Sequence, residues 1–142
     1  MVGSPIQSEV VGNESDRHIR YKQRMANICR RFGYIVFGDR ENEIAVRRDE
    51  TNEPPYYCDL VAILGTRTIV IEVDGYKGHN SRRNLLRDEH RSDYIKENLI
   101  RNSDLEKLLR KRLSGKVELY RFGFWQLKDA SDELIAQELQ LC

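Results

Sequence analysis

The chain has no long apolar segment. No run of apolar residues approaches the ~20 that a helix needs to cross a bilayer, and the first residues lack the apolar core of a secretion signal. Internal repeats and low-complexity tracts are also missing. We therefore expect a protein without a membrane partner that works inside the cell, in the cytoplasm or nucleoid, or in a host cell if its source is viral.

Cysteine is scarce. The chain has three, Cys29, Cys58 and Cys142, and their wide spacing does not match a zinc site. An odd, scattered set of thiols favours a reducing compartment over a disulfide framework. We predict that Cys29 and Cys58 are small buried apolar residues.

The net charge is also small. At +1, the whole molecule has no strong attraction for a polyanion, although a third of its residues are charged. The charges are unevenly distributed, however. Residues 82–121 contain twelve Lys and Arg against seven Asp and Glu, whereas residues 39–59 contain three basic and seven acidic residues. One part of the chain therefore suits phosphate and the other suits cations.

The length and the apolar pattern predict one domain of the α/β class. We expect a flexible N-terminus over residues 1–12 and a single domain over residues 13–142. Apolar periodicity predicts a mixed sheet flanked by helices. The expected helices cover 13–32, 81–101, 103–113 and the segment from about 131, and the expected strands cover 34–37, 43–48, 56–64, 67–74 and 116–122. The expected buried faces are Tyr21, Met25, Ile28, Cys29 and Phe32 in the first helix, and Leu134, Ile135 and Leu139 in the last.

The segment from Arg67 to His79 carries the most chemical information. It begins as a β-branched, apolar strand of the kind that is buried on both faces, and then carries Glu72 and Asp74. Side chains alternate along a strand, so these two carboxylates leave the same face. Two neighbouring acids repel each other and are costly to desolvate, and a cation beside them removes much of that cost.

A second acidic strand precedes this one. Residues 56–64 are apolar except for Asp59 and a pair of tyrosines, and Gly65-Thr66 forms a turn that predicts a β-hairpin with the next strand. Asp59 and Glu72 each lie about six residues from this turn, so pairing of the two strands brings them close together. Lys77 and His79 follow the end of the second strand at Gly75, within reach of the acids.

This pattern resembles the PD-(D/E)XK nuclease superfamily. An acid on one strand, followed by acid-x-acid or acid-x-lysine on the next, is typical of it. The longer pattern of residues 72–79, with Asp88 and Arg91 on the helix that follows, is similar to the branch of very-short-patch-repair and restriction-endonuclease-like domains. Residues 119–122 and the helix after them are similar to that branch's closing strand and helix. Asp74 stands at the position where the superfamily usually has a lysine.

The resemblance implies a restriction-endonuclease-like αβββαβ core and a metal-dependent endonuclease that acts on DNA. It implies a Mg²⁺ or Mn²⁺ ion held by carboxylates and a backbone carbonyl, since hard cations take oxygen ligands. The metal ligands implied are Asp59, Glu72, the carbonyl of Val73, and Glu14 from the first helix. The catalytic residues implied are Asp59, Glu72, Asp74, Lys77 and His79.

Several of these roles have plainer alternatives. Glu14 also suits a first-turn acid placed against the helix dipole. His79 is a candidate proton carrier because the pKa of histidine lies near neutrality, but it also suits a loop residue that bonds a carbonyl. Which of Asp74, Lys77 and His79 replaces the lysine of the superfamily stays open at this point.

A row of arginines provides the expected DNA contacts. Arg83, Arg87 and Arg91 recur every four residues and share one side of their predicted helix. Together with Lys77 they would meet a phosphate backbone beside the acids. The alternative is a solvated face whose arginines pair with neighbouring acids of the same helix. In the resembled branch, Asp88 and Arg91 help to build or brace the site.

Other functions remain compatible with these residues. The chain is expected to nick, repair or restrict DNA, but it also resembles Holliday-junction resolvases, which would make it a homodimer. A third reading is a catalytically silent DNA-binding module that retains a nuclease fold, and Asp74 in place of lysine favours it. RNA is the weakest alternative because no aromatic platform stands out.

Overall fold

The computed structural model describes residues 16–48, 53–75, 82–113 and 115–141. Its main sheet has the strand order β1 (Ile35–Phe37), β4 (Leu60–Leu64), β5 (Arg67–Asp74), β6 (Val117–Gly123). The first two pairings are antiparallel, whereas β5 and β6 run parallel. Two short strands, β2 (Ile44–Val46) and β3 (Tyr56–Cys58), form a separate antiparallel pair. The predicted α/β class with a mixed sheet is confirmed, while the predicted flexible N-terminus lies outside the described residues.

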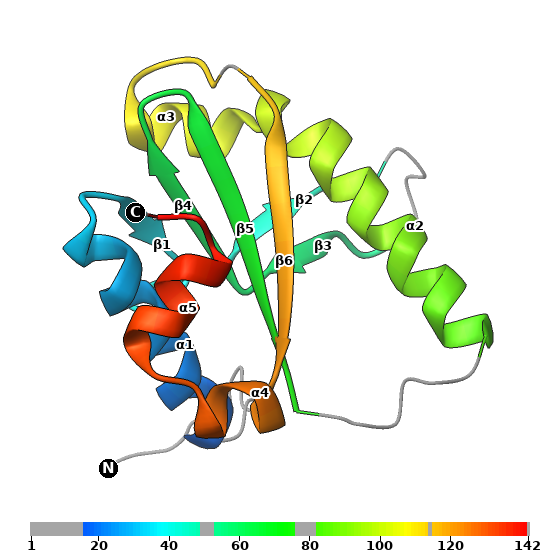
Figure 1. Cartoon of the computed structure of the whole chain (residues 1–142). Helices are drawn as coiled ribbons and strands as arrows, with labels where there is room; N and C mark the ends of the chain where they lie inside the picture. Colours follow the sequence, from blue (N-terminus) through cyan, green and yellow to red (C-terminus); the bar gives the residue numbers. More distant parts are fainter. Residues whose placement is uncertain (1–15, 49–52, 76–81, 114, 142) are drawn as a thin grey trace, which may run out of the picture.

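Helices cover both faces of the main sheet (Figure 1). On one face α1 (Asp16–Arg31) packs beside α5 (Asp132–Glu138), with the short helix α4 (Phe124–Asp129) leading into α5. On the other face lie α2 (Arg82–Asn98), its 3₁₀ extension (Leu99–Arg101) and α3 (Ser103–Leu109). A parallel pair such as β5 and β6 needs a long crossover, and α2 and α3 supply it. None of the described helices is long and apolar enough to span a bilayer.

Each face of the sheet has its own apolar core. Met25, Ile28 and Cys29 of α1 pack with Ile71 and the last two helices. On the opposite face Val70 packs with α2, α3 and the β2–β3 pair, which contributes the second buried thiol, Cys58. The predictions for Cys29 and Cys58 are confirmed, since both are fully buried.

Two predicted core residues are exposed. Phe32 is 39% exposed because α1 ends at Arg31, and the turn through Gly33 at φ +91° redirects the chain before the helical row can continue. Leu134 is 47% exposed because α5 buries the row of Ile135 and Leu139, which are four residues apart. The short helix α4 is a further difference from the sequence prediction, which placed no helix before residue 129 in this region. It begins where the side chain of Gln126 accepts a hydrogen bond from the amide of Gly123 at 2.7 Å.

The strand predicted over residues 56–64 is broken at Asp59. Cys58 pairs with Ile44 in the small sheet, whereas Leu60 pairs with Ile71 in the main sheet. Gly38, at the end of β1, lies against this break with φ +117°, and a Cβ atom there would overlap the carbonyl oxygen of Asp59. The change of sheet at Asp59 therefore depends on a residue without a side chain at position 38.

The Gly38→Ala substitution should destabilise the protein by about 3 kcal/mol or more, because the methyl group meets backbone and the φ value suits only glycine. Gly65→Ala is the matched control. Gly65 also has a positive φ, +60°, but its Cβ would meet no atom within 4 Å, so only the conformational cost of about 1 kcal/mol is expected there. Urea unfolding of the two variants measures the difference, and equal losses would contradict a role for the Gly38–Asp59 contact.

Candidate functional site

Asp59 and Glu72 meet at the point where the chain changes sheet, as their distance from the hairpin turn predicted. The amide of Asp59 donates to Glu72 Oε2 at 2.9 Å, and the amide of Val73 donates to Asp59 Oδ2 at 2.8 Å. The regular pairing of β4 with β5 ends at Leu60 and Ile71. Each carboxylate thus satisfies a backbone N–H at the end of this ladder.

On one side, Asp59 faces helix α1. His18 Nε2 lies 3.5 Å from Asp59 Oδ2 and donates to the carbonyl oxygen of Val73 at 3.0 Å. One turn further along α1, the ammonium group of Lys22 pairs with Glu43 at 2.7 Å, and Lys22 is only 2% exposed. Asp59 therefore belongs to a polar group on the α1 side that also contains His18, Lys22 and Glu43.

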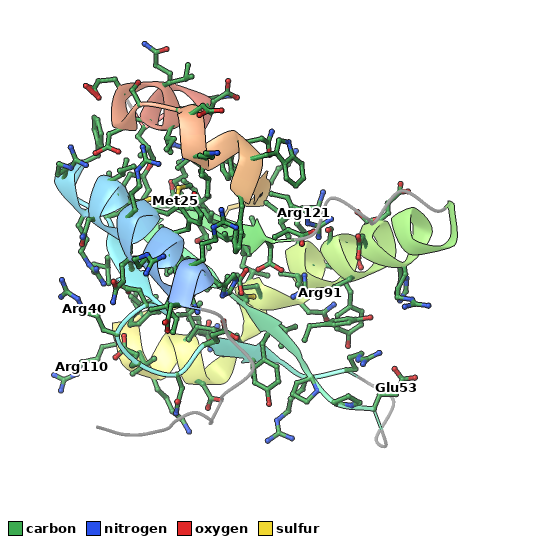
Figure 2. The ribbon with its side chains drawn as sticks, turned by 90° about the horizontal axis from the view of Figure 1, so that it is seen from below. Met25, Arg40, Glu53, Arg91, Arg110 and Arg121 are labelled. Carbon is green, nitrogen blue, oxygen red and sulfur yellow. The ribbon has the colours of Figure 1, made fainter. Side chains whose placement is uncertain are left out.

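On the other side, Glu72 faces helix α2. Its Oε1 atom accepts a hydrogen bond from Arg91, whose second terminal nitrogen donates to the carbonyl of Tyr57 at 2.6 Å. The guanidinium carbon also lies 5.6 Å from the centre of the Tyr56 ring. In Figure 2 Arg91 points inward from α2 toward the strands, whereas Arg40 and Arg110 point outward at the margin of the molecule.

The pKa values of Asp59 and Glu72 are shifted in opposite directions. Burial alone would raise the pKa of Asp59, but the nearby His18, the hydrogen bond from the Val73 amide and the charge of Lys22 lower it below its usual value. Burial and the charge of Asp59 raise the pKa of Glu72, against the opposing effect of Arg91. Asp59 is thus the more firmly ionised member of the pair.

The oxygen atoms at this place suit a small divalent cation. The ionised carboxylate of Asp59 and the carbonyl of Val73 are both hard donors, and both lie close to His18 Nε2. Glu72 faces the other way, and each of its oxygens already accepts a hydrogen bond. Within the described part of the chain, no three His, Cys, Asp and Glu side chains gather as a metal cluster. Asp59 and the Val73 carbonyl are therefore the best metal donors among these residues.

Some of the remaining predicted residues are described by the structure, and the others lie outside the described part of the chain. Asp74 is the partly exposed last residue of β5, opposite Gly123 of β6. Arg87 is exposed on α2, and Asp88 lies 3.9 Å from Arg121 across to β6. The predictions for Glu14, Lys77, His79 and the side chain of Arg83 lie outside the described residues. Those for phosphate binding by Arg87 and Arg91 stay predictions.

Three residues of the site were not predicted: His18, Lys22 and Glu43. The sequence pattern already grouped His18 with Glu14 on one helical row, without a role in the site, and Lys22 follows His18 on α1 after four residues, so the same spacing could have added it. Glu43 precedes a strand, and nothing near it in the sequence indicates its pairing with Lys22. Beside the site, Trp125 is 45% exposed and its ring packs against Gly123.

The chain was compared with known proteins. No protein-family model matches it, and no curated protein matches it. The function must therefore be inferred from these residues and their geometry.

Glu43 should make stability depend on pH. Burial is the largest cause that raises its pKa to about 7, and the neighbouring Asp59 adds to it, against the effect of Lys22. Because the folded state then holds the Glu43 proton more tightly than the unfolded chain does, stability should fall as pH rises from about 4.5 to 7. We expect a loss of about 2–3 kcal/mol across this window that Glu43→Gln removes.

Urea unfolding at pH 5 and pH 7.5 compares the two proteins. Only the change between the two pH values matters, since Glu43→Gln also alters the partner of Lys22 at every pH. The exposed Glu133 of α5 provides the control Glu133→Gln, which should keep the wild-type dependence. Parallel pH profiles for wild type and Glu43→Gln would contradict this role of Glu43.

Proposed function

We propose that this protein is a metal-dependent DNA endonuclease that hydrolyses phosphodiester bonds. The observation that carries the proposal is the convergence of the ionised Asp59 carboxylate and the Val73 carbonyl, beside Glu72. A Mg²⁺ or Mn²⁺ ion bound there would polarise the scissile phosphate and lower the pKa of a bound water. The same residues carry the resemblance to the PD-(D/E)XK superfamily.

The order of the elements supports the proposal. If β2 and β3 are taken as an excursion from the main sheet, the chain runs α1, β1, β4, β5, α2, β6. This order fits the αβββαβ core that the resemblance implies. The parallel pairing of β5 with β6 follows from the crossover through α2, and it brings Asp74 opposite Gly123.

The residues of the chain have separate tasks in this proposal. Asp59 supplies a fixed negative charge, and Glu72 with Arg91 holds the ends of β4 and β5 in register. Asp74, Lys77 and His79 are the candidates for orienting the attacking water or carrying its proton. Arg87 and Arg83 of α2 are the candidates for contacts with the phosphate backbone, which fix the position of DNA without reading its sequence.

Arg91 is better suited to bracing than to binding DNA. Its guanidinium group bonds Glu72 and the Tyr57 carbonyl, so a phosphate would have to compete with a buried carboxylate for it. Arg121 of β6 is nearer to solvent and bonds Ser92 of α2 at 3.2 Å. This arrangement favours Arg87 and Arg121 over Arg91 as the residues that meet the backbone.

A catalytically silent DNA-binding module is the second candidate. The orientation of the two acids favours it, because Asp59 lies against His18 of α1 whereas Glu72 pairs with Arg91 of α2, so their carboxylates do not face one common ion. Metal binding without hydrolysis would decide for this candidate. A resolvase would differ from both in forming a symmetric dimer, which size-exclusion chromatography with light scattering measures.

Loss of the Asp59 carboxylate should abolish the proposed reaction. We expect Asp59→Asn to lower the rate of metal-dependent cleavage at least 100-fold, which corresponds to a rise of roughly 3 kcal/mol in the activation free energy. Glu72→Gln should also lower this rate, because β4 and β5 would be misplaced. The assay uses plasmid, linear, single-stranded and branched DNA with Mg²⁺, with Mn²⁺ or with EDTA. Circular dichroism verifies the fold, and Glu133→Gln is the control. Full cleavage by both site variants would end the proposal.

Arg87→Ala should weaken DNA binding through the loss of one phosphate contact. The slope of log K against log salt concentration should become shallower by about 1. Fluorescence anisotropy with labelled duplex DNA, in EDTA to prevent cleavage, measures that slope. The control is Arg31→Ala at the far end of α1, whose side chain pairs with Asp132. An unchanged slope for Arg87→Ala would remove this residue from the DNA surface.

A further inference from the structure

The Nε2 atom of His18 lies close to both candidate metal donors, the Val73 carbonyl and the Asp59 carboxylate. Its Nε2 atom lies 3.0 Å from the Val73 carbonyl oxygen and 3.5 Å from Asp59 Oδ2. The side chains of His18 and Asp59 are 16% and 18% exposed, so solvent reaches this place only partly. The nitrogen comes from α1, and the two oxygens come from the two sides of the β4–β5 hairpin, far from α1 in the sequence.

The separations of these atoms match those between ligands of one ion. For metal–ligand bonds of about 2.1 Å, two ligands that meet at a right angle lie about 3.0 Å apart, and two ligands at the tetrahedral angle lie about 3.4 Å apart. The distances of 3.0 and 3.5 Å from Nε2 are compatible with these separations, and the shorter one is also the length of an ordinary hydrogen bond. Ion binding would require the Nε2 proton to move to Nδ1 or to solvent, and the cation would lie beside the line that joins Nε2 to the carbonyl oxygen.

The orientation of the His18 ring is fixed by its neighbours. Its centre lies 6.2 Å from that of Phe124, which in turn packs against Tyr21 at 5.0 Å and lies under Arg17. Phe124 also lies against Gly75, directly after β5. The ring is thus held between α1 and the end of β5, with Nε2 directed at the oxygens.

We propose that His18 is a nitrogen ligand of the divalent ion, together with Asp59 and the Val73 carbonyl. This inference deepens the proposed function and rests on it, because both need an ion at Asp59. It also names the class of ion. An imidazole ligand raises affinity for first-row transition metals along the series from Mn²⁺ to Co²⁺ and Ni²⁺, but does little for Mg²⁺. The site should therefore prefer Mn²⁺ and Co²⁺ to Mg²⁺.

Metal titration in the absence of DNA tests the ligand set. Isothermal titration calorimetry of the full chain with Mn²⁺, Co²⁺ and Mg²⁺ should give tighter binding of the first two. His18→Ala should weaken Co²⁺ binding at least tenfold and Mg²⁺ binding much less. His18→Asp replaces nitrogen by oxygen, so it should retain Mg²⁺ binding while losing the preference for Co²⁺. The control is His90→Ala, since His90 is exposed on α2.

Nuclear magnetic resonance gives a readout that does not depend on affinity. Substoichiometric Mn²⁺ should broaden the imidazole signals of His18 beyond detection and leave those of His90 sharp. In Asp59→Asn this selective broadening should disappear. Sharp His18 signals in a protein that binds Mn²⁺, or an unchanged Co²⁺ affinity in both His18 variants, would overturn the inference and show that His18 is not a metal ligand.

The outcomes separate this inference from the proposed function. If the wild-type protein binds Mn²⁺ through Asp59 and cleaves DNA, but His18 is not a ligand, the endonuclease proposal stands and the inference fails. If the His18-dependent ion binds and no DNA is cleaved, the ligand set stands and the silent module is favoured. If wild type binds none of the three ions, both proposals fail together.

Discussion

The exchange of hydrogen bonds between Asp59 and Glu72 is the constraint on which the rest of the structure depends. The Glu72 carboxylate accepts from the amide of Asp59, and the Asp59 carboxylate accepts from the amide of Val73, where the chain passes from the β2–β3 pair into the main sheet. Without these acceptors, two partly buried backbone N–H groups would lose their partners, at a cost of about 1 kcal/mol each. This exchange thus continues the contact between β4 and β5 beyond their regular pairing, and it brings the two acids of the site together.

The same exchange gives the two acids unequal environments. Asp59 receives support from His18, Lys22 and a backbone amide, whereas Glu72 is buried more deeply and depends on Arg91. The charge of each carboxylate therefore has a partner on a different helix, α1 for Asp59 and α2 for Glu72. Helices on opposite faces of the sheet are linked electrostatically through one pair of neighbouring residues.

Much of this arrangement could be predicted because it is local in the sequence. Two nearly continuous apolar runs and the Gly65-Thr66 turn between them predicted the hairpin, and similar distances from that turn predicted that Asp59 and Glu72 lie close together. The break at Asp59 could not be predicted, because it depends on the close approach of Gly38 from another strand. The pairing of Lys22 with Glu43 joins a helix to a distant strand, and no spacing rule covers such a contact.

The position of Trp125 has a practical consequence. It is the only tryptophan of the chain, its ring packs on Gly123, and Gly123 pairs with Asp74 at the end of β5. Intrinsic tryptophan emission from this protein therefore originates from one half-exposed indole at the end of β6. A change in the fluorescence of Trp125 therefore reports a structural change at the end of β5 and β6 without an added label.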